Sequence, residues 1–190
     1  MKTLFSGYSL PLVAALMIIS AVIGMGIGYS LTPEYEASMY EKNTMTLGRS
    51  DRLLDLRYVN AMIAHHRGAM LVAEQALSSE RPEVKGLAQE ILKNEPKAID
   101  ELYAWKKSWY GDARRVLDPR VPNLGAYDAT FDLRFLNAVI AHHENGILMT
   151  QEVRLKSSRS EVLDNADAVE AFLKGGIATL SGWRTAWYSL

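Results

Sequence analysis

Four histidines occur in this chain as two adjacent pairs, His65-His66 and His142-His143, and they are the side chains best suited to chemistry. The chain contains no cysteine, so thiolate nucleophiles and thiolate metal sites are excluded. Imidazole nitrogens in a thiol-free site suit copper, zinc, nickel or iron. The pairs therefore predict a transition-metal site. The alternative is that each histidine is a core residue satisfied by an internal hydrogen bond.

Methionines refine the choice of metal. Met62, His66 and Met70 occur at positions i, i+4 and i+8, which places them on one face of a helix. Met149 lies on the helix flank that it shares with His142. A thioether beside an imidazole favours Cu(I), whereas filling gaps in a core is the other common use of methionine. We therefore expect copper as the metal, with Met62, Met70 and Met149 as additional ligands.

Carboxylates contribute less to the expected site. A di-iron bundle requires Glu three residues before His, but these positions hold Ile63 and Ile140. Glu95, next to Pro96 in the second helix of repeat one, is expected to be a solvated surface charge; the alternative is a ligand or general base. The sequence shows no nucleophile with a base at recognisable spacing and no phosphate loop. We therefore expect a protein that is not an enzyme.

A tandem repeat organises the chain around the histidines. Residues 55–66 and 132–143 are identical at nine of twelve positions. After a one-residue slip, a Trp-x3-Trp-Tyr motif at residues 105–110 recurs at residues 183–188. Every histidine and every tryptophan of the chain lies in the repeat. The sequence therefore predicts two similar structural units.

Each repeat has the pattern of a helix pair. Residues 51–77 are predicted to form one long helix with Ser50 or Asp51 as its N-cap, and Pro82 starts a second helix after a serine-containing turn. Pro96 is expected to bend or locally open that second helix. No segment alternates as a strand does. We expect an all-α, four-helix bundle domain at residues 51–190. Its parts are repeat one (51–110), a linker (111–127) and repeat two (128–190).

The helical period orients the histidines. His66 shares an inward apolar stripe with Met62 and Met70, while His65 lies 100° away in a second stripe that contains Ala61 and Ala69. The second repeat has the same geometry for His143 and His142. Two similar helix pairs can pack around a pseudo-twofold axis. We expect that axis to bring His66 and His143 together, with His65 and His142 nearby.

The N-terminal part of the chain has the character of a membrane segment. Residues 10–29 are apolar and uncharged, and their length approaches what a helix needs to cross a bilayer. Lys2 precedes this stretch and Glu34 follows it, which predicts a cytoplasmic N-terminus and an extracytoplasmic domain. A cleaved signal peptide is the alternative. We expect residues 1–32 to be an anchor or signal segment and residues 33–50 a linker.

The motifs Ile-Ala-His65-His66-x-Gly-Ala and Leu87-Ala88-x-x-Ile91, followed by Trp105, resemble those of the family called domain of unknown function 305. The resemblance covers residues 51–190. It implies a ferritin-like fold in a bacterial protein, either attached to the inner membrane by a single pass or secreted to the periplasm. It further implies a periplasmic copper-handling role for the four histidines. The family's methionine three residues before the helix-two tryptophan is replaced by Leu102 and Leu180.

Two classes of function remain open at this point. The favoured one is a membrane-tethered domain that binds a transition metal, copper above others, for metal handling or storage. The other is an accessory subunit of a membrane complex, with a membrane-protein partner and with the histidines as core hydrogen-bonding elements. A net charge of -1 and the lack of a basic tract argue against nucleic acid as a partner.

Overall fold

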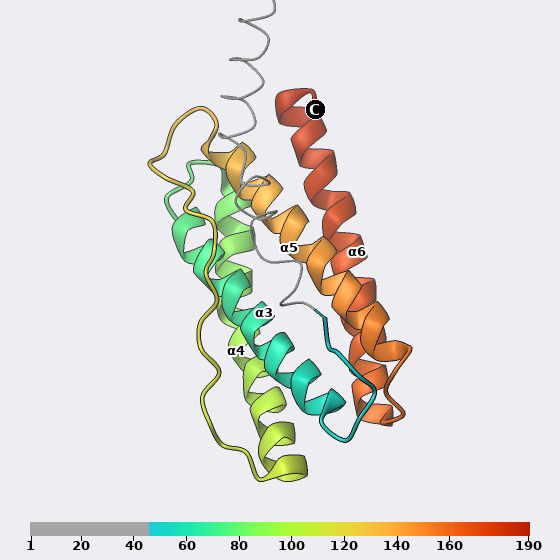
Figure 1. The fold of residues 1–190 in the computed structure, drawn as a ribbon. Helices are drawn as coiled ribbons and strands as arrows, with labels where there is room; N and C mark the ends of the chain where they lie inside the picture. The colour runs from blue at the N-terminus through green and yellow to red at the C-terminus, as the bar shows by residue number, and fades with distance from the viewer. Residues whose placement is uncertain (1–45) are drawn as a thin grey trace, which may run out of the picture.

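The structure is a computed structural model that describes residues 46–190, and these residues form four α-helices and no strand (Figure 1). Helices α3 (Leu54–Ala76) and α4 (Pro82–Tyr110) make one hairpin, and α5 (Phe131–Arg154) and α6 (Ser160–Tyr188) make the other. The prediction of an all-α fold is confirmed. The predicted membrane or signal segment at residues 1–32 lies outside the described residues, as does most of the predicted linker at residues 33–50.

The four helices pack as two pairs. Each helix packs against the other helix of its hairpin, and the two hairpins meet through α3 and α5. Figure 1 shows α4 and α6 on opposite sides of this α3–α5 contact. Within residues 46–190, no helix combines the length and the apolar character that a membrane crossing requires. The first helix of each repeat is thus the element that joins the halves.

The start of α4 follows its sequence signal, whereas the predicted N-cap of α3 at Ser50 or Asp51 is wrong, because the N-cap is Leu53, which makes no side-chain cap hydrogen bond. Helix α3 begins at Leu54, three residues after Asp51, whose carboxylate accepts the Leu53 backbone N–H at 2.9 Å and so closes a preceding turn. Helix α4 begins at Pro82, where the missing N–H costs nothing. Pro96 does not interrupt α4, which continues to Tyr110.

The hydrophobic core consists of two clusters, and the repeat maps one onto the other. One cluster contains Tyr58, Val59, Met62 and Ile63 of α3. The other contains the residues 77 positions later in α5, which are Phe135, Leu136, Val139 and Ile140. Beyond its histidine pair each helix contributes to the other cluster, α3 through Val72 and α5 through Met149, so the pairs lie between the two clusters. The duplication therefore places apolar packing on both sides of the candidate site.

The equivalence extends to the segments before α3 and α5. The buried Leu47 donates its backbone N–H to Glu152 of repeat two at 3.0 Å. Its equivalent, Leu124, donates to Gln75 of repeat one at 2.8 Å. The repeat in the structure thus starts upstream of Asp51.

The turn of each hairpin makes polar contacts with the other hairpin. Ser79 Oγ donates to Asp132 at 2.6 Å, Arg81 pairs with the same carboxylate at 3.3 Å, and the Arg81 guanidinium lies 4.3 Å from the Trp187 ring centroid. The opposite end repeats the arrangement with Asp55, Ser157, Arg159 and Trp109. We call these two sets the Asp–Ser–Arg–Trp clamps. They fix the two repeats against each other at both ends.

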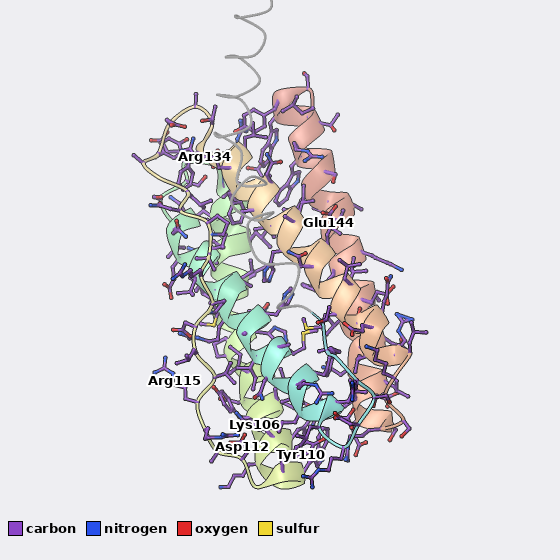
Figure 2. All side chains as sticks on the ribbon, in the orientation of Figure 1. Lys106, Tyr110, Asp112, Arg115, Arg134 and Glu144 are labelled. Atoms are coloured by element: carbon purple, nitrogen blue, oxygen red, sulfur yellow. The ribbon has the colours of Figure 1, made fainter. Side chains whose placement is uncertain are left out.

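The connection between the hairpins, residues 111–130, is tied down at both ends. Near its start, the buried Lys106 donates to the Arg114 carbonyl at 2.7 Å and pairs with Asp112 at 3.7 Å, and Figure 2 shows both residues at the C-terminal end of α4. Near its end, Arg134 donates to the Leu124 carbonyl at 2.7 Å. The connection therefore holds the hairpins in one fixed arrangement.

Candidate metal centre

His65 of α3 and His142 of α5 lie against each other where the two repeats meet. Their rings are stacked, with centroids 3.8 Å apart and planes 7° from parallel. Their neighbours His66 and His143 have ring centroids 6.1 Å from His65 and 6.2 Å from His142, respectively. All four imidazoles therefore gather at one level of the molecule.

The expectation that His66 and His143 form the central pair is wrong, because the inner positions belong to His65 and His142. The cause is the size of the residues around them. A Cβ added at Gly146 would lie 2.8 Å from both Cε1 and Nε2 of His65, whereas one added at Gly68 would make ordinary contact with Cε1 of His142 at 3.5 Å. The stripe of small residues therefore forms the α3–α5 contact, and at Gly146 only glycine leaves space for the His65 ring.

His66 faces the second helix of its own hairpin. Its Nδ1 is hydrogen-bonded to Oε2 of Glu95 on α4. The two side chains are only 14% and 17% exposed. The expectation of a solvated surface charge at Glu95 is therefore wrong. The spacing contained the signal, because Glu95 lies seven residues after Ala88 and four before Ile99, both of which are buried on the inner stripe of α4.

His143 has different surroundings. The position equivalent to Glu95 holds Leu173, 78 residues later, and the Phe172 ring centroid lies 6.3 Å from that of His143. The ring occupies space left by Gly176, since a Cβ there would lie 2.6 Å from the His143 Nδ1. Sequence reasoning missed Phe172, Leu173 and Gly176 as neighbours of the site. The second half of the site is therefore apolar where the first half has a carboxylate.

Burial keeps the imidazoles uncharged. Burial and the neighbouring histidines lower the pKa of His65 well below its usual 6.5. Burial, with His143 and His66 nearby, lowers the pKa of His142 to about 3. Burial lowers the pKa of His143 to about 4, although Glu95 and the Leu173 backbone oppose the shift. At neutral pH these three rings each keep a nitrogen lone pair.

Two of these nitrogens are buried without a partner. Among the described residues, His142 Nε2 and His143 Nδ1 form no hydrogen bond. Buried nitrogens are nearly always paired, so an unpaired one is a candidate donor to a bound ion. Neutral imidazoles with unpaired nitrogens fit a soft or borderline transition-metal ion in their donor chemistry.

The candidate donor side chains are not arranged as a complete metal-binding site. In residues 46–190, no three His, Asp or Glu side chains are placed to hold one metal ion. The lone pairs of an imidazole lie in its ring plane, so two rings stacked at 3.8 Å cannot both direct a nitrogen to an ion between them. Binding by both His65 and His142 would require one ring to turn about its side-chain torsions.

The predicted methionine ligands all belong to one half of the core. Met62 and Met149 are buried in the cluster around Tyr58, and Met70 packs against that cluster while partly exposed. The equivalent positions in the other half hold no sulfur. Val139 corresponds to Met62, Val72 to Met149 and Ile147 to Met70. Sulfur donors are thus available on one side of the histidines.

The fold and site define a class of protein: a duplicated helical hairpin with a buried histidine pair in each copy. The chain belongs to the family described as Domain of unknown function (DUF305), whose model matches residues 55–184. The resemblance seen in the sequence is thereby confirmed.

Solved structures of one protein, CopM, are similar to this chain. CopM in the Cu(I)-bound form is 27% identical with a TM-score of 0.62, and the match covers 69% of this chain and 95% of CopM. CopM in the Cu(II)-bound form is 25% identical with a TM-score of 0.59, covering 70% and 97%. CopM in an Ag-bound form matches with 27% identity, a TM-score of 0.61 and the same coverage as the Cu(I) form. The comparison with curated proteins found no match.

Proposed function

We propose that this protein binds copper through His65, His66, His142 and His143 and that it serves in metal handling or storage. The observation that carries the proposal is the contact between His65 and His142. It brings uncharged imidazoles from both repeats together, and it leaves buried nitrogens without partners. Copper is the cargo in this proposal, and no catalytic step is assigned to the protein.

Copper is favoured over other metals by the donors that surround the histidines. The site contains no thiolate, and neutral imidazole with nearby thioether suits Cu(I), while imidazole alone also suits Cu(II). The similarity to CopM, whose solved forms carry Cu(I), Cu(II) or silver, supports the same choice. Met70, one helical turn after His66, is the thioether best placed along the chain to join it.

The location belongs to the proposal as well. We place the domain on the periplasmic side of a bacterial inner membrane, tethered by a single pass within residues 1–32 or released into the periplasm after cleavage. The support is the apolar, uncharged stretch at residues 10–29 and the charge distribution around it. In that compartment the partners are the membrane and the metal ion.

The test is a copper titration of the full chain in mild detergent under anaerobic conditions, in competition with a Cu(I) chelator. Wild type should bind copper more tightly than micromolar, and replacing all four histidines by alanine should abolish binding. The double variant His65→Ala, His142→Ala should lose most of it. Circular dichroism would establish that the variants keep their helices. Wild-type binding no tighter than micromolar would end the proposal.

An accessory subunit of a membrane complex is the second candidate, and the internal His66–Glu95 hydrogen bond favours it. In that case the histidines serve the core, and a chelator would leave assembly with a membrane-protein partner unchanged. A mild-detergent pull-down with and without chelator separates the two functions. A stoichiometric partner retained by the four-alanine variant would favour the second.

A further inference from the structure

The His66–Glu95 hydrogen bond determines which nitrogen of His66 carries the proton. A carboxylate only accepts hydrogen bonds, so the Nδ1 that contacts Glu95 must be the donor. In a neutral imidazole with the proton on Nδ1, the lone pair is on Nε2. Among the described residues, the contact with Glu95 is the only hydrogen bond of the His66 side chain. The free lone pair therefore lies at the end of the ring away from α4.

We propose that Glu95 is a positioning residue that holds His66 as the Nδ1–H tautomer and so makes Nε2 its copper donor. The copper part of this inference rests on the proposed function, whereas the tautomer does not. In metal sites, a ligand histidine commonly donates its other ring N–H to a carboxylate, which fixes the ring orientation and raises the basicity of the donor nitrogen.

The surroundings of Glu95 restrict it to this role. It projects from the inner stripe of α4 and is largely buried, while its neighbours Lys93 and Lys97 are exposed. Within residues 46–190, its ion pair is with His66 and with no lysine or arginine. The hydrogen-bond partner of this carboxylate is His66, which is a candidate ligand.

The second repeat lacks a carboxylate hydrogen-bonded to its histidine. Leu173 occupies the equivalent position, and His143 Nδ1 is buried without a hydrogen-bond partner in the described part of the chain. No carboxylate of its own hairpin bonds to His143, whose ring contacts the Leu173 backbone instead. The two halves of the site are therefore inequivalent, and repeat one is the tighter-binding half.

The tautomer can be measured in the metal-free full chain by long-range ¹H–¹⁵N correlation of the histidine rings. Wild type should show His66 protonated on Nδ1. Glu95→Gln should keep this tautomer, because the amide oxygen also accepts, whereas Glu95→Leu should shift His66 toward the Nε2–H form. Glu101→Leu, which removes an exposed carboxylate from the same helix, is the matched control and should change nothing. An unchanged His66 tautomer in Glu95→Leu would overturn the inference.

Copper competition titrations of the same variants test the consequence. Glu95→Leu should bind copper about 10–100-fold more weakly than wild type, as is usual when a carboxylate behind a histidine ligand is lost. Glu95→Gln should recover most of the affinity, and Glu101→Leu all of it. Leucine stands at this position in repeat two, so the variant should fold; Glu95→Ala is a second variant without added bulk. Equal affinity in wild type and both apolar variants would overturn the positioning role, whereas absence of copper binding in wild type would overturn the proposed function and leave the tautomer result intact.

Discussion

His66 of repeat one bonds to a carboxylate on α4, whereas His143 of repeat two lies beside Phe172 and Gly176 on α6. The Asp–Ser–Arg–Trp clamps that join the repeats show no such divergence, because the same four residue types form them at both ends. Each clamp takes residues from both repeats, so keeping both clamps requires matching residues in both copies. A contact within one hairpin does not, so it can differ between the copies without disturbing their association.

The largest expected effect is a loss of folding stability at acid pH. Burial lowers the pKa values of His65, His142 and His143 below 6.5, the last two to about 3 and about 4. As pH falls below 6.5 the unfolded chain takes up protons before the folded one, so stability is full above pH 6.5 and is lost toward pH 4. Each histidine contributes up to about 1.4 kcal/mol per pH unit in this window.

Urea unfolding at a series of pH values measures this slope. His143→Leu should flatten it by up to about 1.4 kcal/mol per pH unit, because the neighbours of His143 are apolar and accept leucine. A stability that does not change between pH 6.5 and 4.5 would contradict the burial of the rings. An unchanged slope in His143→Leu would show that burial does not lower the pKa of His143.

Two adjacent glycines on α6 test whether His143 needs the space around it. A methyl group at Gly176 would overlap the His143 ring, while one at Gly175 would meet nothing within 4 Å. Gly176→Ala should therefore destabilise the protein by about 1–3 kcal/mol. Gly175→Ala should stabilise it by about 0.5–1 kcal/mol through helix propensity. Urea midpoints measure both, and similar midpoints would show that His143 does not need the space.

One difference between the two core clusters is a hydroxyl group. Tyr58 is fully buried and its hydroxyl donates to Asn165 at 2.7 Å, while the equivalent residue is Phe135 and the equivalent of Asn165 is Leu87. Tyr58→Phe should cost about 1 kcal/mol, and Phe135→Tyr about 1–3 kcal/mol because its hydroxyl has no partner. Thermal unfolding of both variants tests this, and a neutral Phe135→Tyr would contradict the dry packing of the second cluster.

The smallest expected effect concerns the Asp–Ser–Arg–Trp clamps, which are formed by the same four residue types at both ends. Arg81→Ala and Arg159→Ala each remove one partly exposed ion pair and one cation–π contact, so each should cost about 1 kcal/mol or less. Because the clamps are equivalent, the two losses should agree within about 0.5 kcal/mol, and their effects should add. Unequal losses would mean that the ends of the molecule are not related as the repeat implies.

The helices, their pairing and the repeat register could be predicted because they depend on local signals. Pro82 sets the start of α4, and the identity of residues 55–66 with residues 132–143 sets the register. The gathering of the four histidines also follows from duplication, since equivalent faces meet around a pseudo-twofold axis. Their role as metal ligands stays a prediction, as do Met62, Met70 and Met149 as donors.

The order within each histidine pair could not be predicted from one helix. Both stripes of α3 are apolar, and which stripe meets the other hairpin depends on the close approach at Gly146 of α5. Glu95 was not predicted at the site, because a charged residue in a helix is usually exposed, although its position on the inner stripe indicated burial. A carboxylate on an inner stripe needs a partner on the facing helix, and His66 was the residue available there.

The connection at residues 111–130 is the covalent link that keeps His65 and His142 at high effective concentration. If a protease cut there, each fragment would hold one member of the stacked pair, and their encounter would depend on dilution. An ion bound by both rings would then favour reassociation of the fragments, because it binds the joined form alone. Fragment complementation would thus report on the ion without any spectroscopic probe.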